Sequence, residues 1–228
     1  KPYALTKEEE DIMERLERAF ENCEKLQRHM HFLLNKGGLY KVYNGNLLYH
    51  GCVPLKEDGN LKSVRIFGRA YKGKGLYEVL ESYVRKGFYA MDPKEKERGK
   101  DIMWYIWLSE NSPLFGKDKM ATFERYFLAE KETHKEKKNP YYLLLEDEKV
   151  VEKILKEFGL ENEDAHIING HVPVKCKDGE NPVKCGGKVL VIDGGFSKAY
   201  QKETGIAGYT LIYNSYGLIL AAHKPFES

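Results

Sequence analysis

Cysteine is scarce in this sequence, and the few cysteines present are scattered. They stand at positions 23, 52, 176 and 185 and form no C-x-x-C pair. This spacing argues against a zinc ribbon and against a thioredoxin-like redox site, because both need closely paired thiols. Reduced thiols are the simplest interpretation, and we therefore expect a cytoplasmic protein.

Long hydrophobic runs and a net charge are also lacking. No apolar stretch reaches the roughly 20 residues that span a bilayer, so we expect no membrane partner. Lysine and arginine number 37 against 35 acidic residues, which leaves a net charge of +2. Because such a balance gives no global field for holding nucleic acid, we expect no nucleic-acid partner and only local anion recognition.

The chain also lacks the usual signals of a protein's two ends. It starts Lys1-Pro2-Tyr3, with neither an initiator methionine nor a signal region, and its last residues directly follow an apolar strand pattern. These features favour a fragment of a longer protein. The 228 residues are nevertheless enough for one large domain with its own core, and we expect a single domain.

Helical patterns begin with one long amphipathic segment. Apolar residues recur at helical spacing over residues 6–36, with a capping box of Thr6 and Glu9 at the start and Gly37-Gly38 at the end. Further helices are expected over residues 73–87, 100–108, 121–128 and 147–158. The second of these carries Trp104 and Trp107, which we interpret as core residues. The charge run over 131–138 is interpreted as a solvated face.

Strand patterns alternate with these helices. The Asn44-Gly45 pair lies between two β-prone runs and predicts a hairpin, and a second hairpin is predicted over residues 208–223. Short apolar strands are expected at 166–171 and 188–192. The sequence therefore predicts an α/β (α+β) fold, in which mixed sheets are flanked by helices.

Two histidines share one kind of sequence context. His50 and His171 each end an apolar strand and are followed at once by residues that bend the backbone, in His-Gly-Cys-Val-Pro and His-Val-Pro-Val. Rigid scaffolds present functional side chains at such strand ends, and a neutral imidazole is a good metal ligand. A lone strand-end histidine is more often structural, but two in parallel contexts favour metal ligation.

Two ligands do not complete a catalytic metal site, which normally has three or more. No cluster of histidine or aspartate near these residues supplies the rest. Asp193 is a tempting carboxylate, yet an aspartate in an Asp-Gly pair more often forms a turn. We interpret His134 and His166 as non-ligands.

Longer motifs resemble a known family. HGCVP, NGHVPV, KVLVIDGGFSKAY and GIAGYTLIYNSYG resemble the C-terminal half of the calcineurin-like metallophosphoesterase core. WLSENSPLFGKDKMATFERYF, KEKKNPYY and HKPFES narrow the resemblance to class III fructose-1,6-bisphosphatases of Firmicutes. The resemblance implies a layered β-sandwich flanked by helices. Residues 1–228 would then be one partial domain, its C-terminal half, with a helical insertion at about 71–160.

The same resemblance implies a function. His50 and His171 match the two later histidines of the superfamily and would bind the same ion, whereas the Asp-x-His, Gly-Asp-x-x-Asp-Arg-Gly and Asn-His elements are absent. The complete enzyme would use two manganese ions to activate a hydroxide. That hydroxide would remove the 1-phosphate of fructose 1,6-bisphosphate, giving fructose 6-phosphate in gluconeogenesis. This chain alone should not catalyse.

Phosphate recognition also needs cationic or amide donors. Arg125, Lys117, Asn111 and Lys198 are the candidates, although exposed surface charges or a strand cap explain several of them as well. Two other interpretations stay open: a regulatory or interaction domain that keeps the fold, and a metallophosphatase acting on phosphoproteins or nucleotides. Self-association into a homo-oligomer also stays open.

Overall fold

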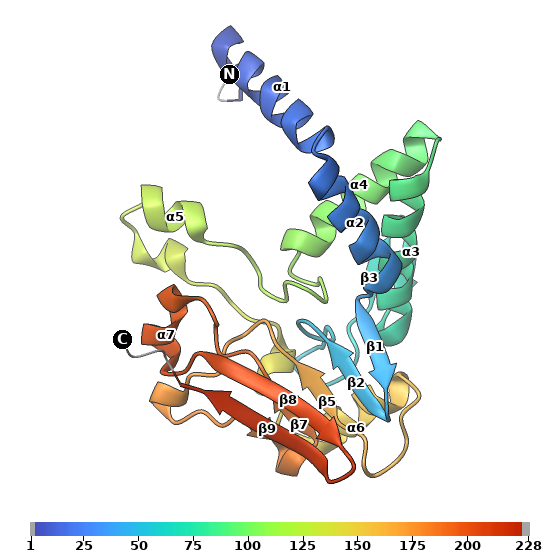
Figure 1. Cartoon of the computed structure of the whole chain (residues 1–228), viewed down its shortest axis with the longest axis vertical. Helices are drawn as coiled ribbons and strands as arrows, with labels where there is room; N and C mark the ends of the chain where they lie inside the picture. Colours follow the sequence, from blue (N-terminus) through green and yellow to red (C-terminus); the bar gives the residue numbers. More distant parts are fainter. Residues whose placement is uncertain (1–2, 225–228) are drawn as a thin grey trace. The chain divides into compact units, whose positions relative to one another are not determined.

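The computed structural model describes residues 3–224, which belong to two compact units. The first unit ends at Gly38 and the second begins at Leu39. The architecture is mixed, with helices and several small sheets, so the predicted α+β class is confirmed (Figure 1). Within the described residues, no helix combines the length and the apolar character needed to cross a membrane.

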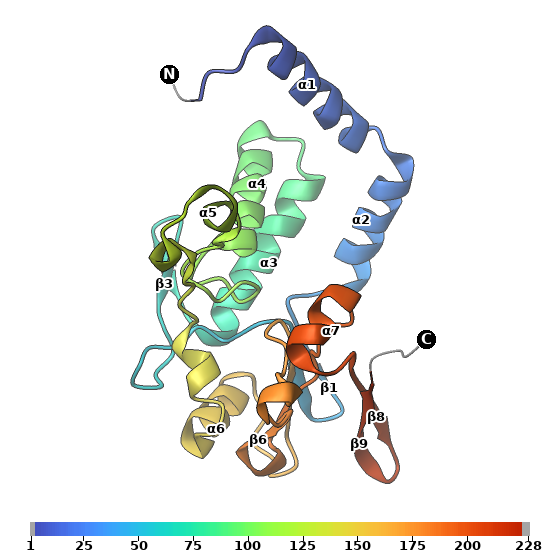
Figure 2. The same ribbon diagram turned by 90° about the vertical axis from the view of Figure 1, so that its left-hand side faces the viewer.

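The first unit consists of two helices rather than the single helix predicted over 6–36. These are α1 (Lys7–Glu21) and α2 (Glu24–Lys36), and Figure 2 shows the bend between them. The break follows from Asn22, whose side-chain Nδ2 and backbone N–H both donate to the carbonyl of Arg18, at 2.8 and 3.0 Å. Asparagine competes in this way for helix carbonyls, which the apolar periodicity does not reveal.

The start of α1 has the predicted capping box. Thr6 Oγ1 accepts from the Glu9 N–H at 3.3 Å, and the Glu9 carboxylate accepts from the Thr6 N–H at 2.7 Å. The other predicted boundary is also confirmed, because Gly37 caps α2.

A five-stranded mixed sheet forms the centre of the second unit, in the order β1-β2-β5-β7-β6. Its strands are β1 (Tyr40–Tyr43), β2 (Asn46–Tyr49), β5 (Ile167–Asn169), β6 (Val183–Lys184) and β7 (Val189–Val191). β2, β5 and β7 are parallel, whereas β1 and β6 are antiparallel to their neighbours. Asn44 and Gly45 connect β1 to β2 with φ of 48° and 74°, as the Asn-Gly pair predicts.

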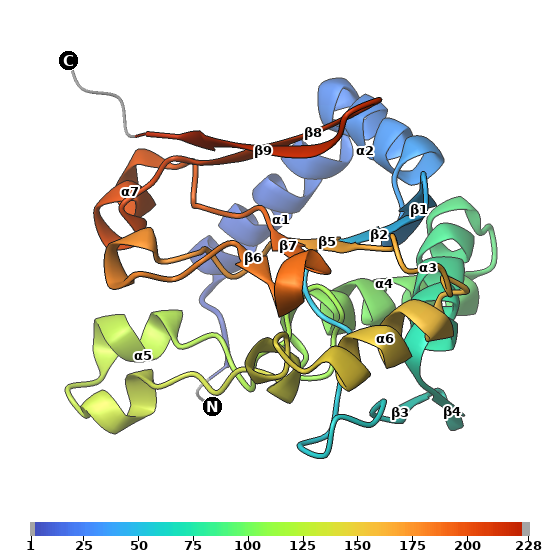
Figure 3. The same cartoon turned by 90° about the horizontal axis from the view of Figure 1, so that it is seen from below.

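A separate two-stranded ribbon lies over one face of this sheet (Figure 3). It consists of β8 (Gly208–Asn214) and β9 (Gly217–His223), which confirms the second predicted hairpin. Its residues Tyr209 and Leu220 join the core that includes Val191 of the main sheet. The sheet and the ribbon therefore form two layers.

Most helices of the second unit lie on the side of the sheet away from the β8–β9 ribbon (Figure 3). The helices of this unit are α3 (Gly73–Tyr89), α4 (Pro93–Leu108), α5 (Thr122–Phe127), α6 (Glu148–Glu157) and α7 (Lys198–Thr204), with short 3-10 turns at Lys131–His134, Pro140–Leu143, Cys176–Asp178 and Cys185–Gly187. A small ribbon of β3 (Val64–Ile66) and β4 (Arg69–Tyr71) precedes α3. Gly87 does not end α3 as expected. It allows a close approach to α4, because a Cβ at Gly87 would lie 2.4 Å from the Gly99 Cα.

The interpretation of the two tryptophans as core residues is wrong. Trp104 and Trp107 are 68% and 67% exposed, and α4 instead buries the face that carries Gly99, Ile102 and Ile106. The charged segment 131–138 is mostly exposed, as expected, but Glu136 turns inward and its side chain is only 15% exposed.

Candidate metal centre

Three neighbouring parallel strands bring potential ligands to one edge of the sheet. His50 follows β2, His171 follows β5 by two residues and Asp193 follows β7 by two residues. Because parallel strands end at the same edge, positions that are 121 residues apart in the chain meet there. The topology thus explains how two separate motifs form one site.

The two imidazole rings lie next to each other in an edge-to-face arrangement. His50 Nε2 lies 3.0 Å from His171 Nδ1, and the ring centroids are 4.8 Å apart. Two nitrogen ligands in cis positions at about 2.1 Å from one ion would be about 3 Å apart, so the pair fits a shared metal ion. The same distance also suits a hydrogen bond between neutral imidazoles.

Backbone and side-chain hydrogen bonds join the segments that carry the two histidines. The Gly170 N–H donates to the His50 carbonyl at 2.9 Å, and Asn169 Nδ2 donates to the Gly51 carbonyl at 3.1 Å. On the other side of β5, the Ile192 N–H donates to the Asn169 carbonyl at 2.9 Å. The separation of the imidazoles is therefore held by the sheet itself.

His171 occupies a strained backbone position. Its φ is +67°, and the Val172 N–H donates to the Gly170 carbonyl at 2.8 Å, so His171 is the central residue of a γ-turn of the rarer, positive-φ kind. Such a conformation costs a non-glycine residue about 1–3 kcal/mol. The strained turn directs the imidazole of His171 toward His50.

A loop after α4 packs against the turn that follows His50. The Cys52 N–H donates to the Pro113 carbonyl at 2.9 Å, and a Cβ at Gly51 would lie 2.4 Å from that same oxygen. Only glycine fits position 51 without moving backbone atoms. The loop also places the ring of Phe115 edge-on to His171, with centroids 6.4 Å apart.

The surroundings lower the pKa of both imidazoles, which favours their neutral form. Partial burial lowers the pKa of His50 below its usual value, against the opposing effect of the Asp193 carboxylate. Burial also lowers the pKa of His171, with further contributions from His50 and Lys117 that outweigh the Phe115 carbonyl and Asp193. A neutral imidazole offers its lone pair to a metal ion without first losing a proton.

Within residues 3–224, no group of three or more histidine, cysteine or acidic side chains is arranged to hold a metal ion. Asp193 lies close by, with Oδ2 4.0 Å from the position of a Cβ at Gly170, but its Oδ1 accepts from the Gly195 N–H at 2.8 Å. That hydrogen bond is the one expected of a turn-forming aspartate. The described residues thus supply two nitrogen donors and a neighbouring carboxylate.

The four candidate phosphate-binding residues are not gathered in one place. Lys117 and Arg125 both pair with Glu136, at 2.9 and 3.2 Å. Asn111 is half-buried, and its Oδ1 has no hydrogen-bond partner among the described residues. Lys198 is exposed at the start of α7.

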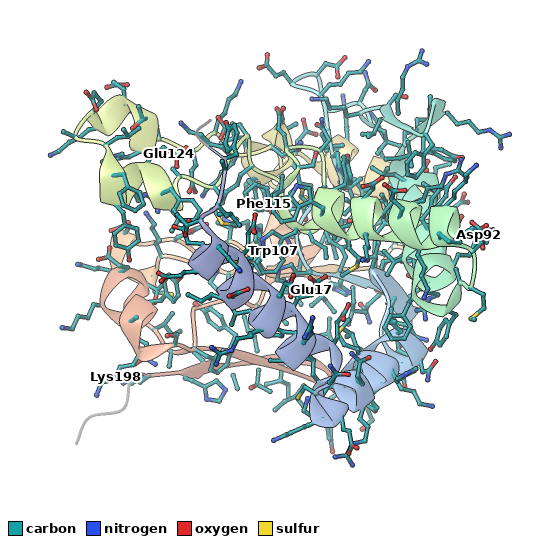
Figure 4. All side chains as sticks on the ribbon, turned by 90° about the horizontal axis from the view of Figure 1, so that it is seen from above. Glu17, Asp92, Trp107, Phe115, Glu124 and Lys198 are labelled. Carbon is teal, nitrogen blue, oxygen red and sulfur yellow. The ribbon has the colours of Figure 1, made fainter. Side chains whose placement is uncertain are left out.

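Figure 4 shows Lys198 well apart from Phe115, the residue that contacts His171. Of the four, Lys117 is the residue whose charge lowers the pKa of His171.

The two histidines that we interpreted as non-ligands have other hydrogen bonds. His134 Nε2 lies 3.0 Å from the Leu128 carbonyl, and His166 Nδ1 lies 3.1 Å from Asn46 Oδ1. Sequence reasoning did not single out Asn169 or Phe115. The Asn-Gly-His motif contained a signal for Asn169, since a polar residue ending an apolar strand needs a partner. The position of Phe115 depends on loop packing that no spacing reveals.

Comparison with known proteins identifies the family. The sequence profile of the Firmicute fructose-1,6-bisphosphatases matches residues 1–228. The chain belongs to this family. It is 59% identical over 228 residues to the class 3 fructose-1,6-bisphosphatase of Clostridium botulinum strain Hall, and 58% identical to that of Clostridioides difficile strain 630. In both comparisons all of this chain is covered, but only 34% of the relative. The chain thus spans about a third of the curated relatives' length. No solved structure matches it significantly.

Proposed function

We propose that this chain contributes two metal ligands, His50 and His171, to a fructose-1,6-bisphosphatase. The observation that carries the proposal is the 3.0 Å separation of His50 Nε2 and His171 Nδ1 at two adjacent strand ends. Relatives named as class 3 fructose-1,6-bisphosphatases support the substrate, fructose 1,6-bisphosphate. The reaction would be hydrolysis of the 1-phosphate to give fructose 6-phosphate, a step of gluconeogenesis in the cytoplasm.

The proposed cofactor is manganese in a two-ion site. Bound divalent ions would supply an activated water and neutralise charge on the phosphoryl oxygens. The residues of this chain hold and orient: His50 and His171 present neutral nitrogens, and the sheet fixes their spacing. Because a catalytic site needs more ligands than these two, the others would come from outside this chain, and this chain alone would be inactive.

The candidate substrate contacts follow from position. The charge of Lys117 lowers the pKa of His171, and Asn111 has an amide oxygen without a hydrogen-bond partner among the described residues, in the loop that packs on Gly51. Arg125 and Lys198 stay weaker proposals, since Arg125 is paired with Glu136 and Lys198 is exposed. Homo-oligomer formation also stays a proposal.

The test is an assay of a full-length family protein that contains this chain. Sugar phosphates, phosphopeptides and nucleotides would be compared with manganese present, after the metal-free protein has been checked for activity. We expect manganese-dependent hydrolysis of fructose 1,6-bisphosphate, with the other substrates at least tenfold slower. Activity confined to phosphopeptides or nucleotides would contradict the substrate, and a fully folded but inactive protein would favour a regulatory domain.

A further inference from the structure

Asn169 is a deeply buried polar residue beside the histidine pair. It is the last residue of β5 and is 2% exposed. Its backbone carbonyl is used within the sheet, where it accepts from the Ile192 N–H. Its side chain reaches in the other direction, to the carbonyl of Gly51 at 3.1 Å. The residue therefore connects the segment of His171 to the segment of His50.

We propose that Asn169 is a positioning residue, which sets the separation of the two imidazoles by fastening the Gly51 carbonyl to the end of β5. The inference rests on the proposed function, because it concerns the metal ligands of that same site. Among the described residues, Asn169 forms no hydrogen bond with either imidazole.

The geometry supports this role because two consecutive carbonyls after β2 accept hydrogen bonds from two consecutive residues at the end of β5. The His50 carbonyl accepts from the Gly170 N–H, and the Gly51 carbonyl accepts from the Asn169 amide. One hydrogen bond alone would let the turn after β2 rotate about it. The second bond, one residue along, removes that freedom. Metal sites tolerate only about 0.5 Å of ligand displacement, so this restraint matters for binding.

The other half of the Asn169 amide argues against a purely structural role. Its Oδ1 is buried and has no hydrogen-bond partner among the described residues. A half-satisfied amide is less favourable in a core than an apolar side chain of similar size. The role of this side chain therefore lies in its Nδ2, which donates to the Gly51 carbonyl.

The same sheet contains a matched control. Asn46 begins β2, is 4% exposed, and forms two hydrogen bonds, from Nδ2 to the Asn44 carbonyl at 3.0 Å and between Oδ1 and His166 Nδ1 at 3.1 Å. It lies at the opposite end of the β2–β5 pair from the histidines. Replacing Asn46 thus removes a comparable buried amide at the end of these strands that lies away from His50 and His171.

The experiment measures Mn²⁺ affinity in a full-length family protein that contains this chain. Four variants are compared: Asn169→Leu, Asn169→Asp, Asn46→Leu and His50→Ala. Metal-free protein is titrated with Mn²⁺, and kcat and KM are measured across Mn²⁺ concentrations. We expect Asn169→Leu to weaken Mn²⁺ binding by about 10- to 100-fold, the usual effect of losing a residue that orients a ligand. Its kcat should recover at saturating Mn²⁺ with KM unchanged, whereas Asn46→Leu should bind Mn²⁺ as the parent does.

Asn169→Asp covers the case in which the leucine variant does not fold. It keeps the size of the side chain but replaces the donor with a carboxylate facing the Gly51 carbonyl, so Mn²⁺ binding should weaken at least tenfold. Unchanged or tighter binding would overturn the inference. If His50→Ala weakens Mn²⁺ binding but the Asn169 variants behave like Asn46→Leu, the inference alone fails. If His50→Ala has no effect on Mn²⁺ binding, the proposed function fails.

Discussion

The two ends of the β2–β5 strand pair each contain an asparagine and a histidine, but at the carboxyl ends these side chains are only partly hydrogen-bonded. At the amino ends, Asn46 and His166 are hydrogen-bonded to each other at 3.1 Å, and Asn46 also donates to the Asn44 carbonyl. At the carboxyl ends, Asn169 and His171 each have a buried polar atom, Oδ1 and Nε2, with no partner among the described residues.

We interpret this difference as one between polar residues that serve folding and polar residues that are available for chemistry. Polar groups that only stabilise a fold tend to be fully paired, because an unpaired buried group costs about 1–3 kcal/mol. The carboxyl end bears that cost together with a positive φ at His171. Unpaired groups and backbone strain at the same edge are typical of a functional site.

The largest effect should come from removing the histidines. In a full-length family protein, His50→Ala should lower both activity and Mn²⁺ affinity by more than the roughly 100-fold upper range for loss of an outer residue. His171→Gly should also lower activity and Mn²⁺ affinity, but this variant should keep the thermal stability of the parent protein, because glycine accepts the φ of +67° without strain.

His166→Ala is the matched control at the amino end. It removes an imidazole that lies 3.1 Å from Asn46 Oδ1, so it should lower the melting temperature slightly and leave the Mn²⁺ dissociation constant unchanged. If His166→Ala weakened Mn²⁺ binding as much as His50→Ala, the two ends of the strands would not differ in function.

A smaller effect is expected from the glycines that follow or precede these strands. Gly51→Ala places a Cβ 2.4 Å from the Pro113 carbonyl oxygen and 3.0 Å from that of Leu114, and it should destabilise the fold by about 1–3 kcal/mol. Because the displaced turn carries His50, Mn²⁺ binding should weaken too.

Gly45→Ala, at the hairpin with φ +74°, should cost about 1 kcal/mol and leave Mn²⁺ binding intact. Thermal unfolding and Mn²⁺ titration of both variants check this difference. Equal Mn²⁺ affinities for Gly51→Ala and the parent protein would show that the loop contact has no influence on the metal site.

The smallest effect is expected from Glu136, whose carboxylate pairs with Lys117 and Arg125. Burial raises the pKa of Glu136, but hydrogen bonds from Lys117 and the Ala121 N–H, with the charge of Arg125, outweigh burial and lower it from the usual 4.5. The folded pKa thus lies below the unfolded one. The stability from this carboxylate is present above the unfolded pKa and is lost as the pH falls through the folded pKa.

Glu136→Gln should therefore cost about 1 kcal/mol at pH 7, since Arg125 is largely exposed, and this cost should shrink as the pH falls well below the usual pKa of 4.5. Urea unfolding of the variant and the parent at both pH values measures it. A cost that does not change with pH would contradict the assignment of a charged Glu136.

Local turn and cap chemistry made much of the fold predictable. The Asn44-Gly45 hairpin, the Thr6 capping box and the second hairpin over 208–223 depend on neighbouring residues, and the structure confirms them. The break at Asn22 was missed because a side-chain hydrogen bond to a helix carbonyl leaves apolar spacing unchanged. The exposure of Trp104 was missed because packing chose a different face of α4.

The candidate site was predictable only in part, for the same reason. His50 and His171 could be named from their strand-end contexts, but their 3.0 Å separation depends on the parallel pairing of β2 with β5 across 121 residues. Likewise, the need for glycine at position 51 follows from the position of Pro113, which is set by tertiary packing. Sequence patterns indicate which residues are suited to a role, whereas topology decides which of them meet.

The most direct test is a crystal structure of a full-length family protein containing this chain, grown with Mn²⁺ and measured at the manganese absorption edge. Our account predicts an anomalous peak within coordination distance of both His50 Nε2 and His171 Nδ1. Manganese peaks elsewhere, with the two imidazoles still hydrogen-bonded to each other, would contradict it.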